Sequence, residues 1–79
     1  MNETVAHDVE LDTSGLNCPL PLLKAKMALN KMLSGQTLKV IATDAGSVRD
    51  FRTFARLAGH ELLQENVDAG TYRYWLRKA

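Results

Sequence analysis

The hydrophobic period of this 79-residue chain changes several times along its length, from two residues to about 3.6 and back. Val9 and Leu11 alternate with acidic residues, which predicts a first strand with one face toward solvent. From about Pro19 to Leu33 the apolar residues recur at helical spacing, and the face they form comprises Leu22, Ala25, Leu29, Met32 and Leu33. Ser34-Gly35 then marks the end of this helix. Such switching indicates a mixed α/β domain.

The second half of the chain repeats this switch. Alternation at Leu38, Val40 and Ala42 predicts a second strand. Ser47-x-x-Asp50 resembles a capping box and opens a second helix that ends at Gly59, with a core face of Val48, Phe51, Phe54, Ala55 and Ala58. Two further strands are expected around 61–67 and 71–77, joined by a tight turn at 68–70. In the last strand Trp75 alternates with Arg73 and Arg77, which would turn it outward.

The predicted order of elements is β-α-β-α-β-β. A right-handed crossover makes the first two strands parallel, and the final hairpin is antiparallel. We therefore expect an α/β two-layer sandwich, with two helices packed on one face of a mixed four-stranded sheet. Residues 1–79 are expected to form a single domain with a frayed terminus at about 1–7. So small a domain has no room for a deep active site, and its function is expected to lie at the surface.

Charge and cysteine content limit the function classes. The net charge of +1 gives no argument for nucleic-acid binding from bulk charge. No apolar run approaches the length that spans a membrane, and the polar start lacks the features of a signal peptide. One unpaired cysteine favours a reducing cytoplasm. His7 and His60 lie far apart without ligand spacing, so no metal site is expected.

Cys18, the only cysteine, stands immediately before the first helix and is followed by Pro19 and Pro21. A residue before proline avoids the α region, whereas proline suits the first helical turn, so Cys18 is expected in the N-cap region of a helix that begins at Pro19 or Pro21. Free backbone N–H groups and the helix dipole there favour a nucleophilic thiolate. The alternative interpretation is a small buried apolar residue.

Two surface stripes are candidates for partner binding. Leu20, Leu23 and Met27, mixed with Lys24 and Lys31, lie away from the core face of the first helix, and they form an exposed docking patch unless a wider core covers them. Arg49, Arg52 and Arg56 recur at i, i+3 and i+7 on the second helix. That row either holds phosphates or an acidic protein surface, or is an ordinary solvated face.

Several motifs together resemble the TusA sulfur-carrier family, also called SirA-like. They are Leu11-Asp12-x-x-Gly15-Leu16-x-Cys18-Pro19-x-Pro21, Ala42-Thr43-Asp44 with Arg49-Asp50, Gly59-His60-Glu61-Leu62, and Tyr72-Arg73-Tyr74-x-Leu76-Arg77-Lys78. The resemblance runs from about residue 9 to residue 78, and its Gly-Leu-x-Cys-Pro-x-Pro core at a strand-to-helix junction is specific.

The resemblance implies a βαβαββ sandwich that carries sulfur as a transient persulfide on Cys18, without another cofactor. Gly15, Leu16, Pro19 and Pro21 would frame this site. The implied partners are a cysteine desulfurase or other persulfide donor and a downstream sulfur acceptor, in a relay that ends in tRNA 2-thiouridine, so a tRNA-modifying complex is a further possible partner. Relatives serve other sulfur pathways. Leu20 replaces a residue that is often charged in the tRNA-modifying members.

Two other function classes compete with a sulfur carrier of the sulfurtransferase type. One is a non-catalytic regulator that binds RNA or protein through the arginine row, with Cys18 structural or redox-sensing. The other is a thiol redox adaptor that cycles through a mixed disulfide with another protein. A C-x-x-C mechanism within one chain is excluded, because there is no second cysteine.

Overall fold

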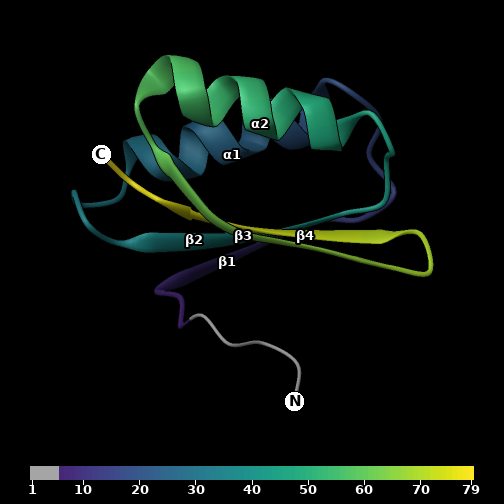
Figure 1. Ribbon diagram of the computed structural model, residues 1–79, viewed down its shortest axis with the longest axis horizontal. Helices are drawn as coiled ribbons and strands as arrows, with labels where there is room; N and C mark the ends of the chain where they lie inside the picture. The colour runs from purple at the N-terminus through teal and green to yellow at the C-terminus, as the bar shows by residue number, and fades with distance from the viewer. Residues whose placement is uncertain (1–5) are drawn as a thin grey trace.

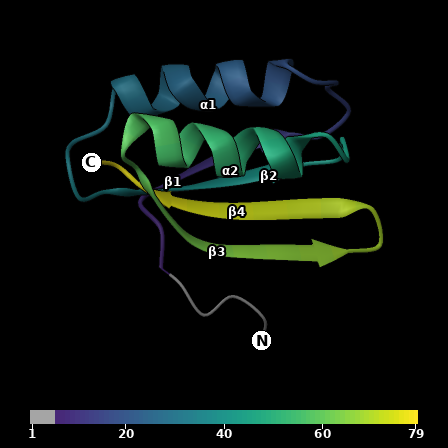
Figure 2. The same cartoon turned by 45° about the horizontal axis from the view of Figure 1, so that its top comes forward.

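The computed structural model describes residues 6–79, and its elements follow the predicted order. They are β1 (Val9–Thr13), α1 (Leu20–Asn30), β2 (Thr37–Ala42), α2 (Ser47–Ala58), β3 (Glu61–Asp68) and β4 (Thr71–Arg77). The sheet order is β1-β2-β4-β3, in which β1 pairs parallel with β2 and the other pairs are antiparallel. Both helices lie side by side over one face of the sheet (Figures 1 and 2). The predicted α/β sandwich is therefore confirmed. Of the terminus predicted to fray, residues 1–5 lie outside the described residues.

The core lies between the helices and this face of the sheet. Its fully buried members are the following residues of the two helices and the two central strands: Ala25, Leu29, Leu38, Val40, Ala42, Phe51, Tyr74 and Leu76. Each large apolar side chain buried here contributes about 1.5–3 kcal/mol. Leu33 was predicted to join them but is 72% exposed. Because α1 ends at Asn30, the helical projection does not extend to residue 33.

Trp75 lies on the sheet face away from the helices, because it alternates with the core residues Tyr74 and Leu76. The alternation predicted this direction, but the ring is only 1% exposed and so does not face solvent. Lys39 is its register partner in β2, and the Lys39 ammonium lies 5.5 Å from the centre of the ring. Long side chains on neighbouring strands thus help to bury an aromatic ring on a face without helices.

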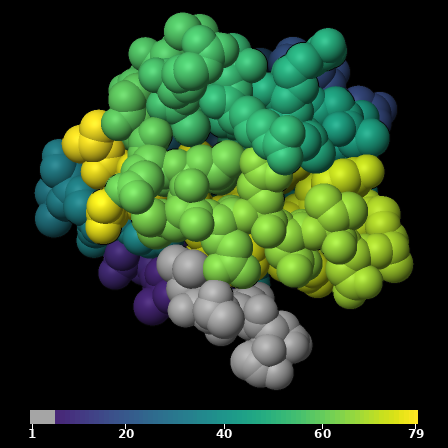
Figure 3. Space-filling model, in the orientation of Figure 1, coloured from purple at the N-terminus to yellow at the C-terminus, as the bar shows by residue number. Residues whose placement is uncertain are grey.

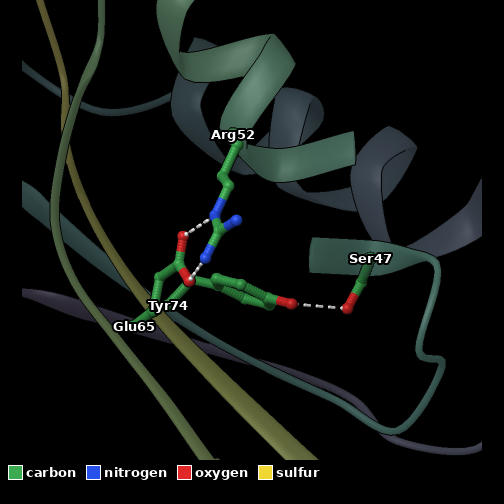
Figure 4. A network of polar contacts seen from close by, with 4 residues as sticks. All are labelled: Ser47, Arg52, Glu65 and Tyr74. Atoms are coloured by element: carbon green, nitrogen blue, oxygen red, sulfur yellow. Dashed lines mark hydrogen bonds and ion pairs between the residues drawn. The ribbon is translucent and has the colours of Figure 1, made fainter. Parts of the chain in front are cut away.

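The predicted capping box at the start of α2 is wrong. Gly46 is the N-cap, and no side chain caps this helix. The Ser47 hydroxyl instead shares a 2.7 Å hydrogen bond with the Tyr74 hydroxyl on β4, as Figure 4 shows. The Asp50 carboxylate is also used elsewhere, as described below. Both side chains that the motif requires make tertiary contacts, and backbone bonds such as Ser47 N–H to the Asp44 carbonyl (3.0 Å) build the first turn.

Two further sets of contacts join elements at the periphery of the fold. Arg52 of α2 donates two hydrogen bonds to the Glu65 carboxylate on β3, of 2.7 and 2.8 Å (Figure 4). In the space-filling view α2 and β3 accordingly form one continuous surface (Figure 3). At the left of that view the segment after α1 meets the C-terminal residues, where the N–H groups of Gly35 and Lys78 donate across to the carbonyls of Lys78 and Gln36.

Candidate functional site

The loop that carries Cys18 leaves the carboxyl end of β1, and the loop of residues 43–46 leaves the carboxyl end of β2. Because β1 and β2 are parallel, both loops lie at the same edge of the sheet. Two hydrogen bonds fix this edge, the first between the strands and the second between the loops. The Thr13 hydroxyl donates to the Ile41 carbonyl (2.6 Å), and the Gly15 N–H donates to the Thr43 hydroxyl (2.8 Å). The cysteine loop is therefore held against the loop that leads into α2.

Gly15 turns the chain away from β1. Its φ of +83° lies in the left-handed region, where a side chain is strained, so glycine is needed here. The Leu16 N–H then closes the turn onto the Thr13 carbonyl (3.1 Å). Gly15 and Leu16 thus form the turn that begins the cysteine loop, and their role in framing the site stays a prediction.

The two prolines define the start of α1. Pro19 is the N-cap, the helix begins at Leu20, and the buried Pro21 lies in its first turn. The helix start therefore falls between the two predicted positions. Pro19 is exposed and follows Cys18 through a cis peptide bond. Cys18 lies one residue before the N-cap, and among the described contacts its sulfur accepts no hydrogen bond from the α1 amides.

The Cys18 side chain is exposed and points to the other helix. Its Sγ donates a hydrogen bond to Oδ2 of Asp50, in the first turn of α2, over 2.8 Å. The interpretation of Cys18 as a buried apolar residue is therefore wrong. The thiol lies at the surface, where a sulfur atom on another protein can reach it.

The charges around Cys18 contradict the predicted thiolate. The hydrogen bond to Asp50 raises the pKa of the Cys18 thiol, and partial desolvation and the negative charges of Asp50 and Asp44 raise it further, whereas Arg49 lowers it. A proton shared with a carboxylate favours the neutral thiol. The expectation from the helix dipole fails because Cys18 turns away from the α1 amides and toward an acid on α2.

Asp44 approaches the same site from the loop before α2. Its Oδ2 is buried and has no hydrogen-bond partner among the described residues. A Cβ atom at Gly46 would lie 2.9 Å from that oxygen and 3.7 Å from the Cβ of Cys18, so the absence of a side chain at Gly46 makes room for the Asp44 carboxylate. Asp44 and Asp50 are the residues that sequence reasoning missed. The parallel β1 and β2 strands were the available signal, since they predict that the two loops meet.

Beside the thiol, α1 presents the predicted apolar patch. Leu20, Leu23 and Met27 are 44%, 45% and 60% exposed, so the core does not cover them. Lys24 and Lys31 are also exposed, and together with Met27 they line a shallow hollow over the edge of α1. We call Leu20, Leu23 and Met27 the α1 patch. Its role in partner binding stays a prediction.

A groove of about 560 Å³ runs between the two helices. Asp50 lines one part of it, and the exposed Leu57 lines another. The other lining residues are Leu22, Lys26, Arg49, Thr53, Phe54 and Ala58. The groove therefore connects the hydrogen-bonded partner of Cys18 with an apolar and basic surface.

The three arginines of the row on α2 make different contacts. Arg52 forms the two-pronged ion pair with Glu65 that Figure 4 shows, which occupies its guanidinium. Arg49 lies close enough to Cys18 to act on the pKa of the thiol, and Arg56 is exposed further along α2. Arg49 and Arg52 line one hollow at the start of α2, and Arg56 is not among its lining residues.

Within residues 6–79, no three His, Cys, Asp or Glu side chains converge as metal ligands would. None of the helices in this part of the chain has the length and apolar character needed to cross a membrane.

Comparison with known proteins identifies the family. The profile of the family described as "Sulfurtransferase TusA" matches residues 9–78. The sulfur carrier protein TusA of Allochromatium vinosum is 54% identical over 72 residues, which cover 91% of this chain and 95% of that protein. The sulfur carrier protein TusA of Pseudomonas putida strain GB-1 is 48% identical over 71 residues, covering 90% and 89%.

The fold has a counterpart among solved structures. The crystal structure of a SirA-like protein from Desulfitobacterium hafniense superposes with a TM-score of 0.79 at 22% identity, and the match covers 89% of this chain and 96% of that one. The family model matches nearly the whole described chain, the relatives are up to 54% identical, and the sandwich is shared with a solved structure. This chain therefore belongs to the TusA sulfurtransferase family.

Proposed function

We propose that this protein carries sulfane sulfur as a persulfide on Cys18, taking it from a donor protein and passing it to an acceptor. The observation that carries this proposal is the exposed thiol of the only cysteine, in a family that includes sulfur carriers 54% and 48% identical to this chain. Gly15, Leu16, Pro19 and Pro21 position that thiol.

The chemistry is a thiol exchange. The thiolate of Cys18 attacks the outer sulfur of a donor persulfide, a new S–S bond forms at Cys18, and the S–S bond of the donor breaks. The donor leaves as a thiolate and takes up the proton that the Cys18 thiol loses. One thiol and one persulfide enter, and one thiol and one persulfide leave, so the transfer needs no external oxidant. A second exchange of the same kind delivers the sulfur to the acceptor.

The helical face is the proposed docking surface for the donor, which we expect to be a cysteine desulfurase. The α1 patch lies directly after the cysteine loop and supplies exposed apolar area. The two helices also carry five basic side chains, Lys24, Lys26, Arg49, Arg52 and Arg56, against the single acid Asp50. An apolar and basic face suits a partner surface with apolar and acidic side chains.

For the acceptor we propose a relay protein in tRNA 2-thiouridine synthesis or a related sulfur pathway, in the reducing cytoplasm. The family resemblance supports this assignment, and a lone exposed cysteine is compatible with a reducing compartment. The uncharged Leu20 between the prolines would then help to select the partner.

The decisive experiment is mass spectrometry of the protein after incubation with a cysteine desulfurase and cysteine. We expect a gain of about 32 Da that maps to Cys18 and is lost on reduction. Cys18→Ser should fold like the wild type, because a hydroxyl can also donate to Asp50, but it should gain no mass. Radioactive sulfur from labelled cysteine that still appears on the serine variant would refute the assignment.

A further inference from the structure

The hydrogen bond between Cys18 and Asp50 has a role that the sulfur-transfer chemistry alone does not require. We propose that Asp50 gates the reactivity of Cys18: its carboxylate holds the unloaded thiol protonated, and a cationic side chain of a docked partner displaces the thiol from that carboxylate. The displacement step rests on the proposed function, whereas the holding step does not.

The fold fixes the position of Asp50, because its short side chain leaves a helical turn that is itself held in place. Its N–H donates to the Gly46 carbonyl (3.3 Å), and the neighbouring Phe51 is buried and stacks on Tyr74 with ring centres 4.6 Å apart. Ser47 is tied to the same tyrosine. The first turn of α2 is therefore fixed to the sheet, and a carboxylate on a fixed helix can hold the thiol of the facing loop in one position.

The charges that face the thiol come from two elements. Asp50 and Arg49 belong to α2, and Asp44 belongs to the loop before it. Residues 14–23, which form the cysteine loop and the first turn of α1, carry no charged side chain. The hydrogen bond to Asp50 and then desolvation raise the pKa of the thiol, and the charges of Asp50 and Asp44 add to them against the opposing charge of Arg49.

The negative charge of the Asp50 carboxylate favours a cation as the displacing group. Asp50 is the single acid among the described residues that line the groove between the helices, beside the basic Lys26 and Arg49, so it is the ionic partner that this groove offers to a cation. A lysine or arginine that reaches Asp50 would form a charge-assisted bond stronger than the one donated by a neutral thiol.

The gate acts only on the unloaded form. Once Cys18 carries a persulfide, its Sγ is bonded to a second sulfur about 2 Å further out and no longer has a hydrogen to donate. The bond to Asp50 therefore exists only before loading. The thiol proton released during loading passes to the departing donor thiolate, so atoms and charge balance as in the exchange described above.

The holding step is tested by the pH dependence of Cys18 alkylation with iodoacetamide, which requires no sulfur transfer. Asp50→Asn should shift the profile to lower pH and raise the rate at pH 7 severalfold, while Asp50→Glu should restore a profile close to the wild type. Asp68→Asn is the control, because it removes an equal charge from an exposed residue that is not among the groups acting on the thiol. Identical profiles for Asp50→Asn and wild type in folded protein would overturn the proposal.

The displacement step is tested by comparing two sulfur donors. With inorganic tetrasulfide, the Cys18 thiolate takes one sulfur and trisulfide leaves, and no protein cation is supplied. Asp50→Asn should then load severalfold faster than wild type. With a cysteine desulfurase the docked partner supplies the cation, and the advantage of the variant should disappear. An equal gain with both donors would overturn displacement. Failure of every form to load, with the alkylation shift intact, would refute the sulfur-carrier function and not the holding step.

Discussion

Ser47 on α2 and Tyr74 on β4 share a buried hydrogen bond of 2.7 Å between their hydroxyl groups (Figure 4). Burial raises the pKa of Tyr74, so the phenol stays neutral at physiological pH although the bond to Ser47 acts in the opposite direction. The bond joins the first turn of α2, which carries Asp50, to a central strand of the sheet. The position of the acid beside Cys18 therefore depends on a contact in the core.

Tyr74→Phe removes one partner of this bond and leaves the buried Ser47 hydroxyl unsatisfied. We expect a loss of about 1–3 kcal/mol in the free energy of unfolding, measured by urea denaturation. Tyr72→Phe, on a half-buried tyrosine of the same strand, is the control and should cost less. In the double variant with Ser47→Ala the losses should not add, because both partners are then gone. Additive losses would contradict a direct bond.

Much of the fold followed from periodicity, because alternation and helical spacing reflect which side chains face the core. Val40 and Phe51 are buried as their patterns predicted, and β1 and β2 are parallel as expected for strands joined by a helical crossover. The errors arose where a contact between residues distant in sequence overrode a rule that considers only neighbouring residues. Ser47 and Asp50 fit a capping box, yet Tyr74 and Cys18 bind them instead.

Prediction of the site was limited in the same way, by contacts between residues distant in sequence. The motif around Cys18 correctly predicted an exposed cysteine before a helix. Helical projection left open whether the core covers Leu20, Leu23 and Met27, and the structure shows them exposed. The direction of the pKa shift was wrong, because it is set by Asp50, 32 residues further along the chain. The dipole of a helix can be inferred from one segment of the sequence. To predict that two loops face each other, one must also know how the strands before them pair.

A pH-dependent contribution to stability is expected from His60. Its Nδ1 accepts a hydrogen bond from the Ala79 N–H (3.0 Å), so the folded state needs the neutral ring. Burial, and then the charge of Lys78, lowers the pKa of His60 below its ordinary value of 6.5. The unfolded chain therefore binds more protons at mildly acidic pH, and the stability that His60 provides above pH 6.5 is lost as the pH falls through the folded-state pKa.

His60→Asn should reduce this dependence, because the Asn Oδ1 atom can accept the same bond but does not titrate. The measurement is the difference in melting temperature between pH 7.5 and pH 5.5 for both proteins. We expect a smaller difference in the variant. A difference as large as in the wild type would assign the pH dependence to other groups.

The last prediction concerns the docking role of the α1 patch. Leu23 is 45% exposed, so Leu23→Asp should change the free energy of unfolding by no more than about 0.5 kcal/mol. The same change places a charge in the proposed apolar contact and should weaken binding to a cysteine desulfurase at least tenfold. Leu33→Asp makes the identical chemical change at a residue that is 72% exposed and lies beyond the other end of α1.

Binding by titration calorimetry and thermal melting of both variants separate the possible explanations. If the patch docks the donor, only Leu23→Asp loses affinity, and both variants melt like the wild type. Unchanged affinity for Leu23→Asp would remove the patch from the interface. Equal losses for both variants would instead indicate that added negative charge weakens the basic helical face as a whole, because long-range attraction does not depend on which leucine is replaced. Repeating the titration with Leu23→Ser, which removes the apolar contact without adding charge, then measures the apolar contribution alone.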